Sequence, residues 1–262
     1  MSWRYLACAT EAVLRAGAIQ RARYGQDIEI QHKGTIDLVT EVDRACEVAV
    51  LEVLRAHFPA HDIVTEESVL ERSGSRFLWF VDPLDGTTNF AHNYPFFCCS
   101  VGLAQDGVPV AGAVYDPLKD ELFTAERGAG AHLNGRRLRV THRASLLESL
   151  LLTGFPYDLR SDLPGKLALF NRFMGEARAV RRDGAAALDL AYVAAGRADG
   201  FWEERLQSWD MMAGRLFVEE AGGRATRFDG SGLGLVADEL VAAGPELHGL
   251  MLEVLARETA RA

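Results

Sequence analysis

The N-terminal part of the chain places apolar residues at helical intervals. This spacing predicts an amphipathic helix over residues 3–24, with Gly25 as its stop signal. Its apolar face could serve a membrane or a partner, but packing against the protein's own core is the commoner use of such a face and is the interpretation adopted. Thr40 is a good N-cap residue, so a second helix is expected from there to about Phe58, where Pro59 ends it.

The middle of the chain has a strand pattern. Short apolar runs occur at Asp62–Thr65 and Phe77–Val81. The Asp106-Gly107 step is a typical hairpin turn and joins Cys98–Ala104 to Val108–Tyr115. Antiparallel sheet is therefore expected to dominate this part of the chain.

From Leu147 onward, short apolar runs alternate with helical patterns, as in an α/β arrangement. Strands are expected at 150–153, 178–180, 200–203 and 241–243. Helices are expected at 164–174, 185–196, 209–221 and 246–257. The change of pattern near residue 145 predicts a single catalytic unit, 1–262, with lobes of about 1–145 and 146–262 that share one cleft.

Composition narrows the function classes. Of the 262 residues, 48% are hydrophobic and 25% are charged, which is ordinary for a soluble globular protein. The formal charge of −9 and the lack of a basic block disfavour binding to nucleic acid or to a membrane surface. An acidic protein can still bind phosphate where divalent cations reverse the local charge, so the composition favours a metal-dependent site.

Cysteine usage and hydropathy indicate a cytoplasmic protein. The four cysteines, Cys8, Cys46, Cys98 and Cys99, have no metal-ligand spacing and are interpreted as reduced core thiols. Charged residues interrupt the N-terminal apolar stretch, so no signal peptide is expected there. Charges also interrupt each candidate for the roughly 20 apolar residues that a membrane span needs.

The candidate chemistry lies in residues 80–90, Phe-Val-Asp-Pro-Leu-Asp-Gly-Thr-Thr-Asn-Phe. Asp82 and Asp85 follow an apolar strand and can converge on hard cations, with the Leu84 carbonyl as a further oxygen ligand, which suits magnesium better than zinc. The amides of Gly86 and Thr87 then form a natural cradle for a phosphate. By spacing alone the segment is also compatible with an ordinary capped turn.

The complete string resembles the first signature of the inositol monophosphatase family. The second signature is similar to Trp209–Gly214 together with Glu219–Gly223, and further matches are 33–43 and Thr65–Ser68. The resemblance covers nearly the whole chain. It implies a layered α-β-α-β-α sandwich, with an antiparallel sheet in the N-terminal lobe and a second, mixed sheet in the C-terminal lobe. It also implies a homodimer.

The resemblance implies a set of magnesium ligands. Glu66, Asp82 and the Leu84 carbonyl would hold one ion, Asp82, Asp85 and Asp210 would surround a second, and Glu66 would hold a weak third. This agrees with the residue chemistry, because two ions that share Asp82 would clamp a phosphate while one of them lowers the pKa of the attacking water. Each carboxylate taken singly has a simpler role as a first-turn or surface charge, but their joint occurrence favours a metal site.

The catalytic roles come from the same resemblance. Thr87, hydrogen-bonded to Asp43, would orient and deprotonate the water, with Glu66 as the third catalytic residue. The phosphate would lie against Asp85 and the amides of Gly86 and Thr87. The departing alkoxide would lie near Asp210, where a metal-bound water would protonate it.

Substrate contacts are expected at Glu203 and at the Gly184-Ala185-Ala186 turn, with a solvated strand end as the alternative for Glu203. Three positions depart from the family pattern: Ala185 replaces Ser or Thr, Arg205-Leu206 replaces a Gly-like turn, and Met212 replaces a small residue. Lys33 would approach the phosphate from a loop. Arg181 and Arg182 are interpreted as a surface pair outside the site.

These features predict magnesium-dependent hydrolysis of small phosphate monoesters, with myo-inositol 1-phosphate or a similar polyol phosphate as the leading substrate. Fructose 1,6-bisphosphate, histidinol phosphate, NADP and 3′-phosphoadenosine 5′-phosphate are alternatives with the same chemistry. The compact length favours the polyol branch. A different class is a non-catalytic module that binds a metal ion or a sugar phosphate, and hydrolysis of a generic phosphate ester distinguishes the two.

Overall fold

The computed structural model describes residues 3–32, 38–68, 70–156, 163–236 and 238–259. The helices are α1 (Trp3–Arg23), α2 (Glu41–His57), α3 (Thr87–Ala91), α4 (Leu163–Glu176), α5 (Ala186–Ala194), α6 (Ser208–Glu220) and α7 (Pro245–Thr259), with a short 3-10 helix at Leu146–Glu148. The strands are β1 (Ile30–His32), β2 (Leu38–Thr40), β3 (Asp62–Thr65), β4 (Phe77–Asp85), β5 (Cys98–Gln105), β6 (Val108–Asp116), β7 (Glu121–Glu126), β8 (Gly130–Leu133), β9 (Arg136–Arg137), β10 (Leu150–Thr153), β11 (Ala179–Arg181), β12 (Gly200–Glu204), β13 (Arg224–Thr226) and β14 (Glu239–Ala243).

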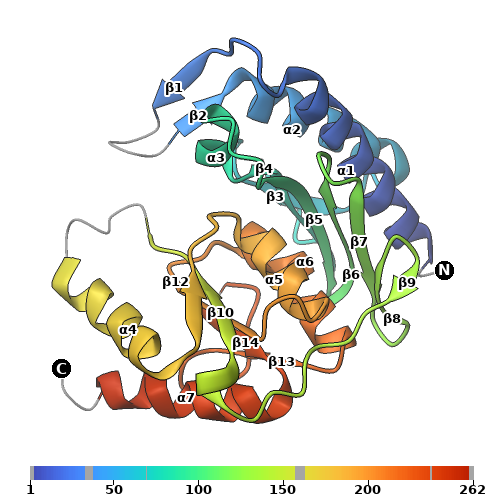
Figure 1. Cartoon of the computed structure of the whole chain (residues 1–262). Coiled ribbons are helices and arrows are strands. Elements are labelled where there is room, and N and C mark those ends of the chain that lie inside the picture. Colours follow the sequence, from blue (N-terminus) through green and yellow to red (C-terminus); the bar gives the residue numbers. More distant parts are fainter. Residues whose placement is uncertain (1–2, 33–37, 69, 157–162, 237, 260–262) are drawn as a thin grey trace.

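Helix and sheet layers alternate through the molecule. Helices α1 and α2 cover the outer face of one sheet, α5 and α6 lie between the two sheets, and α4 and α7 cover the outer face of the second sheet (Figure 1). The expected α-β-α-β-α sandwich is therefore confirmed.

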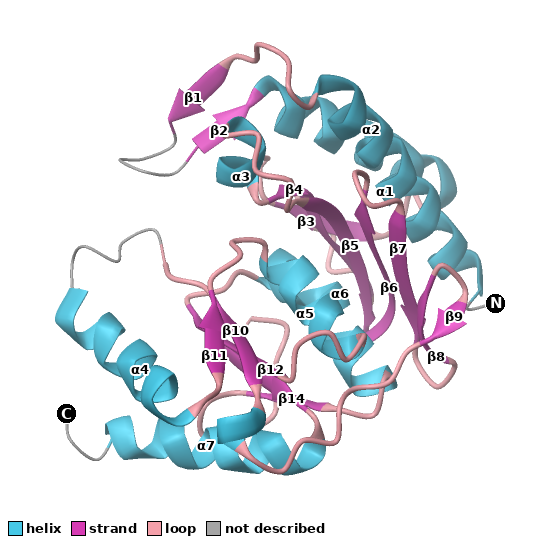
Figure 2. Cartoon of the chain, viewed as in Figure 1, coloured by secondary structure: helices cyan, strands magenta, loops and turns pink. Residues whose placement is uncertain are grey.

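The first sheet has seven strands in the order β3-β4-β5-β6-β7-β8-β9 (Figure 2). Its pairs are antiparallel apart from the edge pair β3–β4, which is parallel. The β5–β6 hairpin pairs Cys99 with Tyr115, and Asp106 and Gly107 both have positive φ, as a type I′ turn requires. The expected hairpin is confirmed, and β7 to β9 extend the sheet beyond it.

The second sheet has five strands in the order β11-β10-β12-β14-β13. Strand β10 runs parallel to β11 and β12, whereas β14 is antiparallel to β12 and β13, so the sheet is mixed as expected. Strand β11 begins at Ala179, one residue later than the sequence pattern indicated.

Small residues allow close approach of the outer helices. Ala9, Ala12 and Ala16 of α1 have no exposed surface and pack in a cluster with residues of α2, β4, β5 and β6. The interpretation that this helix face packs on the protein's own core is confirmed. The four cysteines are buried and form no disulfide, in agreement with their interpretation as core thiols.

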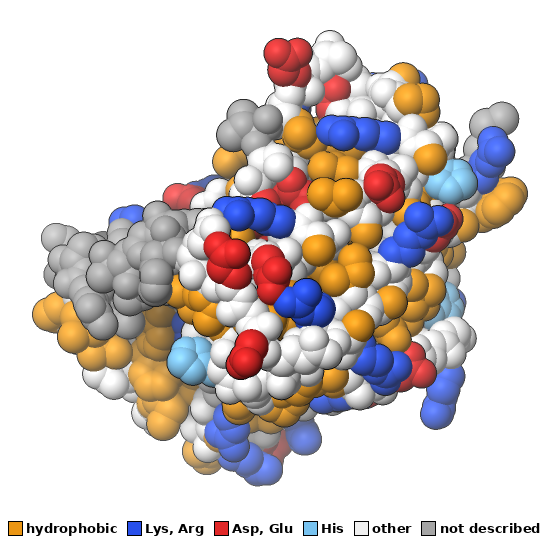
Figure 3. Space-filling model, turned by 90° about the horizontal axis from the view of Figure 1, so that it is seen from above, with side chains coloured by type: hydrophobic (Ala, Val, Ile, Leu, Met, Phe, Trp, Pro, Cys, Tyr) orange, Lys and Arg blue, Asp and Glu red, His pale blue; other side chains and the backbone are white. Residues whose placement is uncertain are grey.

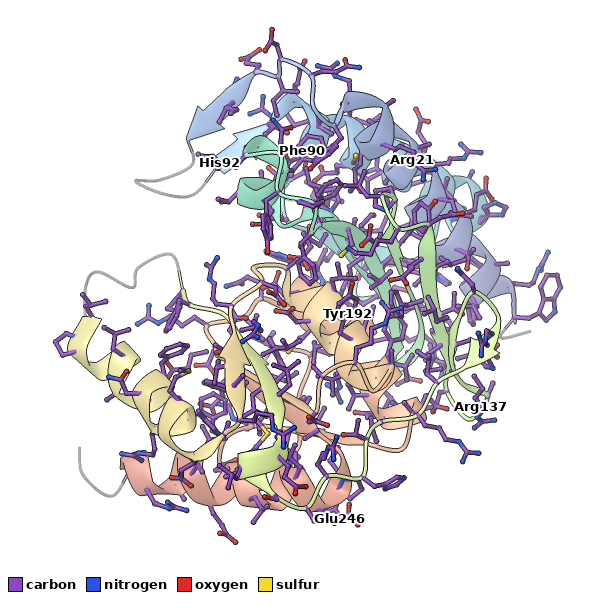
Figure 4. All side chains as sticks on the ribbon, in the orientation of Figure 1. Arg21, Phe90, His92, Arg137, Tyr192 and Glu246 are labelled. Carbon is purple, nitrogen blue, oxygen red and sulfur yellow. The ribbon has the colours of Figure 1, made fainter. Side chains whose placement is uncertain are left out.

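The middle layer explains one departure from the family pattern. Met212 of α6 is fully buried beside Leu78, Phe80 and Ala104. A Cβ on Gly102 of β5 would lie 2.9 Å from Met212 Cγ, so the absent side chain at Gly102 makes room for the large residue at 212. In the same layer, Tyr192 projects from α5 (Figure 4) and packs edge-to-face on Phe96.

The surface mixes both charges. On the face seen in Figure 3, Lys and Arg side chains alternate with Asp and Glu around apolar side chains. No helix in the described part of the chain combines the length and the apolar character that crossing a membrane requires.

Candidate active site

One cavity of about 500 Å³ collects nearly all of the predicted site residues from both halves of the chain. Eleven of them line it: Glu66, Asp82, Leu84, Asp85, Gly86, Thr87, Gly184, Ala185, Ala186, Glu203 and Asp210. Asp43 does not line the cavity and contacts it through Thr87. Lys33 lies outside the described residues.

A break in strand pairing places the carboxylates of Asp82 and Asp85 at the cavity. β4 pairs with β5 up to Asp82, the register then shifts, and pairing resumes at Asp85. Pro83 has no N–H to donate to a ladder, and irregularities of this kind re-aim side chains at the rims of sheets. The Leu84 N–H donates to Asp82 Oδ1 at 3.0 Å, which fixes that carboxylate at the end of the strand.

The next turn requires glycine. Gly86 has φ +90°, and a Cβ there would lie 2.9 Å from the Phe96 carbonyl oxygen. Helix α3 begins directly afterwards, and its buried Phe90 (Figure 4) packs edge-to-face on Phe97 at 4.9 Å between ring centroids. Thr87, the first residue of this short helix, is thereby held at the cavity wall.

Thr87 and Asp43 form a buried pair. The Thr87 hydroxyl contacts Asp43 Oδ1 at 2.8 Å and the Leu84 carbonyl oxygen at 3.0 Å. The second oxygen of Asp43 accepts from the backbone N–H of Thr40 at 2.8 Å and completes a capping box at the start of α2. Burial raises the pKa of Asp43, and these hydrogen bonds partly oppose that rise.

Asp85 joins the two halves of the site. Its Oδ2 accepts from the Ala187 N–H at 2.8 Å, near the start of α5. The N-cap residue of α5 is Ala185, whose side chain cannot accept a hydrogen bond, so Asp85 supplies the oxygen that Ser or Thr would provide. Asn89 adds a second connection by donating to the Asp183 carbonyl at 2.8 Å.

Asp210 has the same position in α6 as Asp43 in α2. Each is the third residue of its helix, and Asp210 Oδ2 accepts from the Gln207 N–H at 2.7 Å. The other oxygen of each carboxylate remains for a contact outside its own helix. Asp43 and Asp210 therefore both act as helix-start charges, and both also have a place at the site.

The carboxylates of the cavity destabilise one another's charged forms. Burial, then the charges of Glu66, Asp85 and Asp210, hold the pKa of Asp82 well above its usual range. Burial raises the pKa of Asp85 to about 6, and burial followed by the Asp85 charge raises that of Asp210. Such a concentration of buried and half-buried acid groups is stable in ionised form only with a counter-cation.

The donor set fits a hard divalent cation. Every predicted ligand offers oxygen, including the Leu84 carbonyl, and none offers nitrogen or sulfur. Among the described residues, no three acidic, imidazole or thiol groups converge on a single point, so the carboxylates line the cavity and do not form a closed cage. Magnesium suits this arrangement, because it keeps several waters and is held by one or two carboxylates plus phosphate oxygens.

Glu203 of β12 also lines the cavity. A Cβ on Gly154 would be 2.2 Å from the Glu203 carboxylate, so this carboxylate packs directly against the Gly154 backbone, and a side chain at 154 would displace it. Burial, then the Asp85 charge, raises the pKa of Glu203 to about 8, and Arg182 opposes the rise. The interpretation of Glu203 as a solvated strand end is wrong.

Arg182 lines the same cavity, so placing it outside the site was also wrong. Its position two residues before Gly184 was the available signal. Other lining residues that were not assigned to the site from the sequence are Gly154, Phe155, Pro156, Gln207 and Trp209. Residues 154–156 come from the loop after β10, where residue type alone carries little information, whereas Trp209 lies in the first turn of α6.

The remaining departure has a backbone explanation. Arg205 adopts φ +60°, the left-handed conformation that a Gly-like residue would occupy at lower cost. Leu206 is buried and lines the cavity next to it. A larger hollow of about 770 Å³ lies between α1 and Thr124 of β7. It is mostly apolar, and its Glu11 and Arg15 pair with each other, so it lacks the chemistry of the acidic cavity.

Comparison with known proteins gives consistent matches over the whole chain. A model of the inositol monophosphatase family matches residues 3–260. An inositol-1-monophosphatase of Synechocystis sp. is 44% identical over 254 residues, covering 96% of this chain and 88% of that protein. A Nus factor SuhB of Pseudomonas aeruginosa is 47% identical over 233 residues, covering 87% and 86%. The solved structure of an inositol monophosphatase from Anabaena (Nostoc) sp. matches with a TM-score of 0.89 at 42% identity, covering 97% and 96%. The chain therefore belongs to the inositol monophosphatase family.

Proposed function

We propose that this protein hydrolyses small phosphate monoesters of polyols in a magnesium-dependent reaction, with myo-inositol 1-phosphate as the leading substrate. The observation that carries the proposal is the Thr87 hydroxyl, held by the buried Asp43 at 2.8 Å, at the wall of a cavity lined by five carboxylates. The inositol-1-monophosphatase relative supports the same substrate class.

The proposed ligands divide into two groups. Glu66, Asp82 and the Leu84 carbonyl hold one ion, Asp82, Asp85 and Asp210 hold a second, and Glu66 also serves a weak third. Magnesium bound there supplies Lewis-acid stabilisation of phosphate charge and lowers the pKa of water.

The chain's own groups then orient the reactants. Thr87 accepts a hydrogen bond from the attacking water while its hydroxyl proton is directed to Asp43, which is the proton acceptor of the pair. The backbone at Gly86 and Thr87 holds the phosphate, and Glu66 completes the water's surroundings. Asp210 lies beside the departing oxygen.

The polyol is assigned to the lining residues from the C-terminal half of the chain. Glu203 and the Gly184-Ala185-Ala186 turn offer a carboxylate and backbone groups that suit sugar hydroxyls. Arg182, which also lines the cavity, favours substrates with a second anionic group, so fructose 1,6-bisphosphate is the alternative that this observation supports. A panel of inositol, glycerol, histidinol and nucleotide phosphates with this bisphosphate ranks the candidates by kcat/KM.

The alternative of a different class is a non-catalytic binding module. One relative is named a Nus factor, which states no enzymatic activity, so family membership does not decide between the classes. The Thr87–Asp43 pair favours catalysis, because metal or sugar binding alone does not require a hydroxyl aligned on a buried carboxylate.

Activity on an aryl phosphate is expected to require magnesium and to vanish in excess chelator, because the clustered carboxylates need the ion's charge. Calcium is expected to substitute poorly, since its coordination sphere is larger and looser. Steady-state rates with magnesium, calcium and EDTA check this. Full turnover in EDTA would exclude the proposed mechanism, and no turnover under any condition would favour the binding module.

Glu203→Gln is expected to lower kcat/KM for inositol 1-phosphate much more than for an aryl phosphate. The amide keeps the size of the side chain but replaces one acceptor oxygen by a donor. The assay is run at pH 9, where a carboxyl of pKa about 8 is ionised. An equal loss on both substrates would place Glu203 in catalysis or folding instead of substrate selection.

The proposal also covers the organisation of the chain into lobes, its localisation and its oligomeric state. We expect one catalytic unit, 1–262, whose lobes of about 1–145 and 146–262 share the cavity, and a cytoplasmic homodimer. Sedimentation analysis of the full chain tests the dimer.

A further inference from the structure

A buried carboxylate on α2 has no place in the mechanism described above. Glu47 is 4% exposed and lies one helical turn after Asp43, so both side chains leave the same face of the helix. The Glu47 side chain contacts the segment that follows β3, which contains Glu66.

Three donors of that segment point at Glu47. The Thr65 hydroxyl donates to Oε2 at 2.8 Å, the Glu67 N–H donates to the same oxygen at 3.1 Å, and the Ser68 hydroxyl donates to Oε1. The donors flank Glu66 on both sides in sequence. Glu66 itself is attached to β4 by its N–H, which donates to the Val81 carbonyl at 3.3 Å.

We propose that Glu47 is a positioning residue that fixes the Glu66 carboxylate at the cavity wall. Helix α2 then fixes two parts of the site through one face: Asp43 holds Thr87, and Glu47 holds residues 65–68. A carboxylate suits this role because it only accepts hydrogen bonds, whereas the three groups that face it all donate. This inference rests on the proposed role of Glu66 as a magnesium ligand.

Groups that orient metal ligands without touching the metal commonly matter nearly as much as the ligands. Their removal costs about 10- to 100-fold in metal affinity or activity. Without Glu47, the two hydroxyls and the Glu67 N–H lose their shared acceptor, and residues 65–68 lose three of the hydrogen bonds that hold the segment in place. The Glu66 carboxylate would then sample several positions, and each binding event would have to order it again.

The chain contains a matched control at the other end of β3. Asp62 is 5% exposed and accepts from the Ser73 N–H and hydroxyl at 2.8 Å, the Gly74 N–H at 2.9 Å and the Ser75 N–H at 3.0 Å. It is therefore a buried carboxylate with a comparable set of donors, but none of these residues lines the cavity. Removing the Asp62 carboxylate tests the loss of a buried acceptor of several hydrogen bonds, without changing a residue of the cavity.

The experiment measures magnesium binding by calorimetry on the full-length protein, with thermal melting of the metal-free form. Glu47→Ala is expected to weaken magnesium binding by about 10- to 100-fold. Glu47→Gln keeps one acceptor oxygen, and the hydroxyls can rotate, so it is expected to recover most of the affinity. Asp62→Ala is expected to lower the melting temperature and to leave magnesium affinity at the parental value.

Parental magnesium affinity in Glu47→Ala, with a melting loss like that of Asp62→Ala, would show a purely structural role and overturn the proposal. If Glu47→Ala does not fold, Thr65→Val and Ser68→Ala remove single donors, and unchanged magnesium affinity in both overturns it equally.

A parent that binds no magnesium would refute the proposed function and not the positioning role. In that case, hydrogen exchange of the backbone amides tests the positioning role of Glu47. Faster exchange at Glu66 and Glu67 in Glu47→Ala, but not in Asp62→Ala, supports it, and unchanged exchange overturns it.

Discussion

Replacing Thr87 with valine is expected to lower kcat by about 10²- to 10⁴-fold, the usual contribution of a positioned acid–base group. Valine keeps the shape of threonine but removes the hydroxyl that contacts Asp43 Oδ1 at 2.8 Å. The attacking water then loses its connection to the buried carboxylate. Asp43 also loses one of its donors, so a decrease in stability of about 1–3 kcal/mol is expected as well.

The matched control is Thr87→Ser, which keeps the hydroxyl and is expected to retain most of the activity. Single-turnover rates at saturating magnesium measure the chemical step, and melting with and without magnesium measures the metal site. The magnesium-induced rise in melting temperature is expected to be parental in Thr87→Val. Parental turnover in Thr87→Val would refute the role of the pair in activating water.

Asp210→Asn is expected to lower turnover by about 100-fold or more, as the loss of one preorganised electrostatic group does in other enzymes. Asparagine keeps the shape and an acceptor oxygen for the Gln207 N–H, so the start of α6 is preserved. The negative charge beside the departing oxygen and the second ion is lost. Both magnesium binding and stabilisation of the leaving alkoxide should weaken.

The metal-free Asp210→Asn protein is expected to melt no lower than the metal-free parent. Burial and the Asp85 charge raise the pKa of Asp210, so the ionised carboxylate destabilises the folded state above that pKa, and a neutral amide removes the penalty. Magnesium should then raise the melting temperature less than in the parent. Parental turnover together with a parental magnesium shift would show that Asp210 only begins the helix, and the two-ion arrangement would fail.

Local chemistry explains why most elements could be predicted from the sequence. Thr40 caps α2, and Asp106-Gly107 forms the β5–β6 turn, because each depends on residues within a few positions. The predicted start of β11 was one residue too early, because a short strand has no capping residue that marks its boundary.

The candidate site was predicted less evenly. Asp82 and Asp85 are neighbours in sequence, so their convergence follows from one turn. Glu203 was expected at the site and lines the cavity, whereas Arg182 was interpreted as a surface charge, because membership of a shared cavity depends on where other segments lie. The side chain of Ala185 cannot cap α5, and no neighbouring residue replaces it. The acceptor oxygen for the Ala187 N–H comes from Asp85, 102 residues before Ala187 in the chain.

By itself, the sequence determined the periodicity of the helices and strands, the oxygen-donor chemistry of the proposed ligands and the family resemblance, because these depend on residue type and short spacing. The resemblance also implied the hydrogen bond between Thr87 and Asp43. Only the tertiary structure decided that Asp85 caps α5, that Glu203 packs against Gly154, and that Glu47 binds the segment containing Glu66. Those contacts join segments far apart in the chain. The raised pKa values of the Asp43, Asp85 and Glu203 carboxyl groups likewise follow from the burial and the neighbouring charges that folding creates.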